Sequence, residues 1–213
     1  MADGASVTVR SVSIRHLEDR MEINEELRQN VIKSLPELEE IGDDSLRNKV
    51  IDAWAYSLSR SSFTSIDGIR PSGNPDTAAL KSGTQTDHIR GVTQLAIAIA
   101  DSMAKQFPQL PIIRDLLVAC ALCHDVGKPY EFDPVNQERW MKQPGTSGLP
   151  AIRHTQYGTH VCLTVGLPEE VCHAAGCHSG EGELVQRSLH VTIVHHADYA
   201  FWATAKAGGQ LQD

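Results

Sequence analysis

The sequence of 213 residues lacks most of the features that mark specialised classes of protein. No apolar run reaches the roughly 20 residues that cross a bilayer, and residues 1–20 mix charges without the apolar segment of a secretory signal. The five cysteines are an odd number, which argues against a disulfide framework. Lys and Arg are few, 19 against 27 Asp and Glu, so the formal charge is −8 and a nucleic-acid polymer is not an expected partner. We expect a cytoplasmic protein that contacts no membrane.

Apolar residues recur with helical spacing along most of the chain. The composition, 41% hydrophobic and 22% charged, is that of a folded soluble protein. The pattern predicts helices over residues 24–32, 46–58, 86–106, 112–125, 151–165, 168–177 and 184–206. Residues 130–150 hold three prolines and two charged clusters, and we predict a long loop there. A short strand is an alternative only at residues 6–13, so the predicted fold class is all-α.

The chain divides into two parts at a segment rich in Ser, Gly and Pro. This segment, residues 61–83, is longer than most connections within a domain, and connections of that length are often functional. It leads directly into His88, so we expect it to cover any site formed there. We assign residues 1–83 to an N-terminal helical extension and loop, and residues 84–213 to a second domain.

Histidine is the overrepresented residue type. The chain has ten, seven of them between His154 and His196, and histidine is a common metal ligand and acid–base group. The adjacent pair His124-Asp125 ends an apolar helix, where a change of backbone direction lets both side chains reach one metal ion. Gly127 then permits a tight turn, and Lys128 supplies a cation suited to an anionic substrate oxygen.

The order of these residues resembles the HD-domain superfamily of metal-dependent phosphohydrolases. The resemblance covers roughly residues 83–205 and includes the string Gly166-Leu167-Pro168-Glu169-Glu170-Val171. It implies a helical bundle around a metal site, preceded here by the helical extension. The separated matches, in chain order, are His88, the His124-Asp125 pair, His154, His178 and Asp198.

The resemblance also implies a ligand set. His88, His124, Asp125 and Asp198 are the basic metal ligands, and Asp125 bridges when two ions bind. Family members with two metals add two histidines from intermediate helices. His154 and His178 occupy those places and imply a dinuclear centre. The alternative is that both are ordinary surface histidines, in which case the site would be mononuclear. Imidazoles with carboxylates suit Fe, Mn, Zn, Ni or Co, and residue types do not choose among these divalent transition metals.

Further residues are candidates for catalysis and substrate binding. We assign catalytic roles to Asp125 and Lys128, and Lys128 would also bind the substrate. Arg90 and Arg153 flank predicted ligands and would bind phosphate. The equal alternative for each is an exposed charge on a helix surface. Tyr157, three residues after His154, would face the site or pack in the core.

The predicted function is that of a metal-dependent hydrolase. We expect a phosphohydrolase that acts on a small anionic substrate, a phosphate ester or a nucleotide, through a metal-activated water. The alternative is an HD-domain di-iron oxygenase that uses dioxygen to cleave a C–C or C–P bond. A noncatalytic binding module ranks last because no ligand is missing. A homo-oligomer is an open alternative to a monomer.

Overall fold

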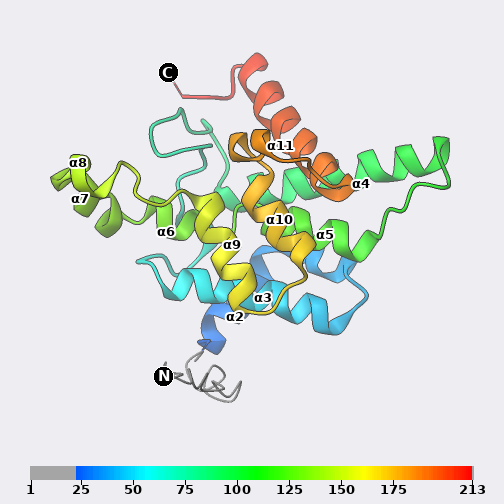
Figure 1. Ribbon diagram of the computed structural model, residues 1–213, viewed down its shortest axis with the longest axis horizontal. Helices are drawn as coiled ribbons and strands as arrows, with labels where there is room; N and C mark the ends of the chain where they lie inside the picture. Colours follow the sequence, from blue (N-terminus) through cyan, green and yellow to red (C-terminus); the bar gives the residue numbers. More distant parts are fainter. Residues whose placement is uncertain (1–22, 213) are drawn as a thin grey trace, which may run out of the picture.

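Helices make up most of the computed structural model, which describes residues 23–212 (Figure 1). Local capping fixes their starts: Asn24 accepts a hydrogen bond from the backbone N–H of Glu26, and Thr84 and Asp87 form a capping box. The helices of the first half are α2 (Glu25–Ser34), η1 (Pro36–Glu40), α3 (Asp44–Ser59), η2 (Ile66–Gly68) and α4 (Gln85–Gln106).

The second half of the chain surrounds α5 (Arg114–Cys123), whose residues 117–123 are all buried. Helices α3 and α4 pack against α5 from the first half, and two later helices, α10 and α11, complete its surroundings. The helices that follow α5 are α6 (Lys128–Phe132), α7 (Pro134–Lys142), α8 (Pro144–Ser147), α9 (His154–Thr164), α10 (Glu169–Cys177), η3 (Gly180–Leu184) and α11 (Leu189–Ala207). Each helix predicted from the sequence is present, and the all-α fold class is confirmed for the described residues.

The predicted loop over residues 130–150 is wrong. The segment contains most of α6, all of α7 and all of α8. Its prolines begin helices instead of interrupting them, because Pro134 and Pro144 each stand in the first turn of a helix, where a missing N–H costs nothing. Asp133 reinforces the start of α7 by accepting a hydrogen bond from the backbone N–H of Val135.

The segment between α3 and α4 pairs with the C-terminal tail. Ser72 and Ala79 form an isolated antiparallel bridge, and Leu80 forms another with Leu211. The backbone N–H of Gln212 donates to the carbonyl of Ala79 at 2.8 Å. Apart from such bridges, residues 23–212 contain no strand; the alternative strand at residues 6–13 lies outside the described residues.

The N-terminal helices share one hydrophobic core with the rest of the described chain. Trp54 of α3 is fully buried, and its indole N–H donates to the carbonyl of Leu122 at 2.8 Å. Figure 1 shows α2 and α3 on the side of the molecule opposite α11. The boundary between residues 83 and 84 remains a prediction about organisation, because both sides contribute to this core. None of the helices described has both the length and the hydropathy to cross a membrane.

Candidate metal centre

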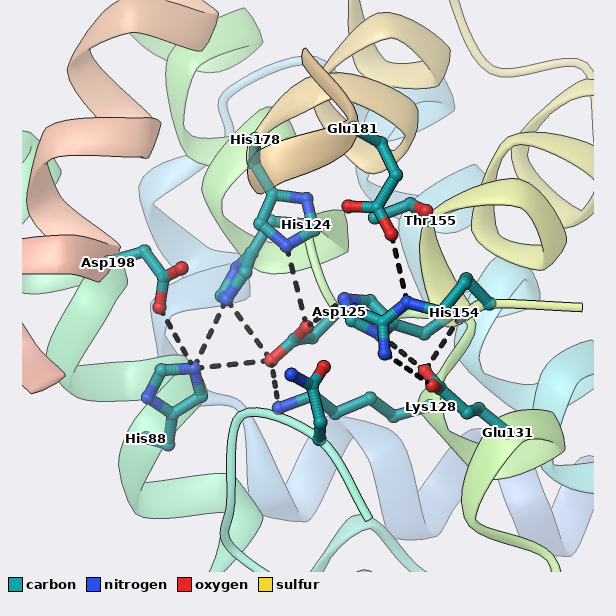
Figure 2. A network of polar contacts seen from close by, with 12 residues as sticks. His88, His124, Asp125, Lys128, Glu131, His154, Thr155, His178, Glu181 and Asp198 are labelled. Carbon is teal, nitrogen blue, oxygen red and sulfur yellow. Dashed lines mark hydrogen bonds and ion pairs between the residues drawn. The ribbon is translucent and has the colours of Figure 1, made fainter. Parts of the chain in front are cut away.

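Six buried side chains from five places in the chain converge between α4, α5, α9, α10 and α11 (Figure 2). Each lies at or near a helix end except the one from α11, which projects from the middle of its helix. The six are His88 near the start of α4, His124 and Asp125 directly after α5, His154 at the start of α9, His178 directly after α10, and Asp198 in α11.

The ligand atoms form two neighbouring groups. Within each group, one nitrogen or oxygen atom from every member lies within 4.8 Å of the others. The first group is His88, His124 and Asp198; the second is Asp125, His154 and His178.

Asp125 spans the two groups with its two carboxylate oxygens. Its Oδ2 lies 3.2 Å from His88 Nε2 and 3.3 Å from His124 Nε2. Its Oδ1 lies 3.5 Å from His154 Nε2 and 3.6 Å from His178 Nε2. The carboxylate is therefore placed to bridge two cations, as the family resemblance implied.

The hydrogen bonds of the imidazoles fit a metal site. The Nδ1 atoms of His124 and His178 contact the carbonyls of Ala121 and Ala174 at 2.6 and 3.0 Å, so these nitrogens carry the protons. In the neutral rings each Nε2 then presents a lone pair to a carboxylate oxygen, and either a metal ion or a proton can lie between these two acceptors. In addition, the buried Oδ1 of Asp198 lies 3.4 Å from His88 Nε2 but accepts no hydrogen bond from any described residue. The donor set therefore suits divalent transition metals.

The local charges favour the protonation states that metal ligands need at Asp125, His88 and His178, but not at His124. Burial opposes ionisation of Asp125, but Lys128 and His124 outweigh burial and hold the pKa of its carboxyl well below the usual range. Burial lowers the pKa values of His88 and His178, which keeps both rings neutral. Burial also opposes charge on His124, but the neighbouring carboxylate outweighs it and raises the pKa of that ring. Asp125 is thus the negative charge around which the site is arranged.

Lys128 lies at the bottom of the site, almost fully buried. Its Nζ lies 2.8 Å from Asp125 Oδ2 and donates to the carbonyl of Ser72 at 2.7 Å. A residue that sequence reasoning missed, Gln85, donates from Nε2 to the same Asp125 oxygen at 2.9 Å. Its spacing of three residues before His88 is the signal that could have identified it, because residues i and i+3 share a helix face.

A cavity of about 520 Å³ opens over these residues. Asp125, Lys128 and three of the other ligands form its floor, and one side of α11 forms a wall. The expectation that residues 61–83 cover the site is confirmed, because four of them line the cavity. The lining residues above the floor are Gly73, Asn74, Thr77 and Ala78 from the loop, Ser179, then Tyr199, Trp202, Ala203 and Lys206 from α11, and Leu211 from the tail.

The structure does not bring the other predicted substrate-binding residues to this cavity. Arg90 pairs with Glu37 at 3.0 Å, because two residues of helix turn it away from the face that carries His88. Tyr157 stacks on Tyr130 with ring centroids 4.0 Å apart, and burial raises its pKa to about 12.

Arg153 is also engaged away from the cavity wall. It pairs with Glu131 at 2.7 Å and with Glu181 at 2.9 Å. Glu131 itself is fully buried and accepts hydrogen bonds from both the backbone N–H and the Nδ1–H of His154 (Figure 2). Sequence reasoning missed Glu131 because it lies in the segment predicted to be a loop. His195, three residues before Asp198 in α11, contacts the backbone of a candidate ligand: its Nδ1 lies 2.6 Å from the carbonyl oxygen of His178.

Comparison with known proteins gives one family. The family model for the HD domain matches residues 86–201, a range that contains all six candidate ligands. No curated protein and no solved structure matches the chain.

Proposed function

Because this chain belongs to the HD domain family, whose members are usually metal-dependent hydrolases, we propose that it is a phosphohydrolase acting on a small phosphate ester or nucleotide. The observation that carries the proposal is the position of Asp125. Its carboxylate joins two groups of metal-ligating atoms, and the ammonium of Lys128 lies beside it on the floor of the same cavity.

The six converging side chains would hold two divalent ions, of Fe, Mn, Zn, Ni or Co. Such ions, when bound, lower the pKa of a water molecule and polarise a phosphoryl oxygen. Asp198 and Asp125 each contribute one negative charge against the four positive charges of two divalent ions. The remaining positive charge favours an anionic substrate.

The chain's own residues would bind and orient that substrate. Lys128 is the cation of the cavity floor, so its Nζ would bind a phosphoryl oxygen and stabilise the negative charge that develops there. Trp202, Ala203 and Leu211 give the walls an apolar surface for the uncharged part of the substrate. The loop that carries Ser72 closes one side of the cavity and limits the access of water.

The second group of ligands also favours a second candidate. Four imidazoles and two carboxylates suit a pair of iron ions as well as they suit hydrolytic metals, so a di-iron oxygenase that cleaves a C–C or C–P bond is the alternative. Metal identity and the need for dioxygen separate the two chemistries.

The test is a screen of phosphate monoesters, phosphodiesters and nucleotides with the metal-loaded protein, in air and without oxygen. A phosphohydrolase releases phosphate equally under both conditions, whereas turnover that stops without oxygen would refute hydrolysis. Asp125→Ala is expected to lose metal and activity together. Asp101→Ala, the same substitution at an exposed position of α4, is the control that retains both. An active Asp125→Ala variant would contradict the assignment of the site.

A further inference from the structure

The buried carboxylate of Glu131 accounts for an asymmetry between the two groups of ligands. We propose that Glu131 is a positioning residue that retains the second metal ion by holding the His154 ring. The inference rests on the two-ion centre of the proposed function, but not on the reaction that the centre performs.

The two groups differ in the number of carboxylates that each contains. The first group contains a carboxylate of its own, Asp198, besides the shared oxygen of Asp125. The second group has only the shared carboxylate and two imidazoles, His154 and His178. With fewer anionic ligands, an ion in the second group is the more weakly held of the two.

The imidazoles also differ in what holds them. His124 and His178 each direct Nδ1 at a backbone carbonyl of their own helix segment, which is a neutral acceptor. His154 directs Nδ1 at the Glu131 carboxylate. A carboxylate behind a ligating histidine fixes the orientation of the ring and makes its other nitrogen a stronger donor. The second group thus gains, through His154, the negative charge that Asp198 gives directly to the first.

Glu131 is itself fixed on both sides. One oxygen accepts from the backbone N–H of His154 at 2.8 Å and from the ring of the same residue. The other accepts from Arg153 at 2.7 Å, and Arg153 in turn binds Glu181, which follows His178 in η3. Figure 2 shows Glu131 and Glu181 beside His154, on the side away from Asp198. The Glu131 carboxylate therefore serves to orient the ring: both of its oxygens accept hydrogen bonds, and Glu131 belongs to neither group of ligand atoms.

The chain offers a matched control for this arrangement. Glu170 accepts from Nδ1 of His190 at 2.9 Å, so it forms the same kind of carboxylate–histidine pair between α10 and α11. Neither residue belongs to either group of ligand atoms. Glu131→Gln and Glu170→Gln thus remove the same charge from the same kind of contact, once inside the centre and once outside it.

Titration of the metal-free protein with Mn²⁺, followed by calorimetry and by electron paramagnetic resonance, tests the proposal. The wild type is expected to bind two ions in two steps and to give the signal of a coupled pair. Glu131→Gln should bind the first ion as the wild type does and the second about 10- to 100-fold more weakly, leaving the signal of an isolated ion. Glu170→Gln should bind both ions with wild-type affinities.

Each other outcome overturns the idea. Wild-type affinity for the second ion in Glu131→Gln refutes the role of Glu131 and leaves the two-ion centre intact. A wild type that binds only one ion refutes the two-ion centre and the role of Glu131 together. If Glu131→Gln does not fold, Glu131→Asp replaces it, since aspartate keeps the charge beside Arg153 but is one methylene too short to hold the ring. Wild-type affinity for the second ion in Glu131→Asp would also refute the proposal.

Discussion

Replacing Gly127 by alanine tests how closely the His-Asp turn packs against the helix that carries His154. The backbone at Gly127 has φ −84° and ψ −8°, which an alanine adopts without strain, so the turn itself does not require glycine. The expectation that Gly127 permits a tight turn therefore misplaces its role. A Cβ added there would lie 2.6 Å from the amide nitrogen of Gly158 and closer still to the carbonyl oxygen of His154. Both are backbone atoms of α9, which cannot rotate out of the way.

The magnitude follows from that collision. Overpacking a core lowers the free energy of unfolding by about 1–3 kcal/mol where side chains can adjust. A clash with the backbone of a packed helix should cost about 3 kcal/mol or more. A loss of about 3 kcal/mol lowers the Tm of a chain this size by roughly 6–12 °C. Because α9 begins at His154, relief of the clash moves that ligand away from Asp125, and Gly127→Ala should also weaken binding of a second ion.

Thermal unfolding of the metal-free variant measures the loss of stability separately from the weaker binding of a second ion. Gly145→Ala is the matched control, because a Cβ at Gly145 meets no heavy atom within 4 Å. Gly158→Ala, whose Cβ would lie 3.3 Å from that of Ala175, should fall between the two. Equal Tm values for Gly127→Ala and Gly145→Ala would refute the reasoning, since the clash with α9 should lower the Tm of the first variant and not that of the second.

Three further predictions concern residues outside the ligand set. Ser57→Ala removes a 2.6 Å hydrogen bond to the buried carbonyl of Val126 and should cost about 1–3 kcal/mol in urea unfolding; an unchanged midpoint would contradict this. Burial opposes ionisation of Glu170, but its hydrogen bonds outweigh burial and hold its pKa below the usual 4.5, so its stabilisation is full above pH 4.5 and is lost as the pH falls through the folded-state pKa. Glu170→Gln should therefore flatten that part of the pH dependence of Tm, and a parallel curve would show that another group is responsible. Arg90→Ala and Tyr157→Phe should leave the KM for a phosphate ester unchanged, because both side chains lie off the cavity wall; a raised KM would return either residue to the substrate site.

Most of the candidate ligands could be predicted from the sequence because they lie beside a strong local signal. His88 follows the capping box of α4, and His124-Asp125 ends an unbroken apolar helix. His178 ends a helix that begins after Pro168. Order along the chain then matched the pattern of a known family, and the structure brings these side chains together.

The residues that support the ligands could not be predicted in the same way. The pairing of Glu131 with His154 joins positions 23 residues apart, and it depends on α6 forming where prolines suggested a loop. The same applies to Arg90, whose partner Glu37 lies in η1, 53 residues earlier in the chain. A charged residue near a ligand in sequence faces the site only if the helix turns it there, and that depends on the packing of distant elements.

Helix α3, which precedes the residues matched by the family model, supports the candidate metal centre. A helix that ends inside a protein leaves carbonyl groups that need partners. The apolar helix α5 ends directly before His124, and two carbonyls around the ligand pair, those of Leu122 and Val126, are satisfied by side chains of α3. Trp54 and Ser57 thus hold the backbone on either side of the His-Asp pair, and α3 covers the apolar surface of α5. A chain without α3 would expose that surface and leave both carbonyls without these partners. Helix α3 therefore buries the end of α5, and the positions of His124 and Asp125 depend on these contacts.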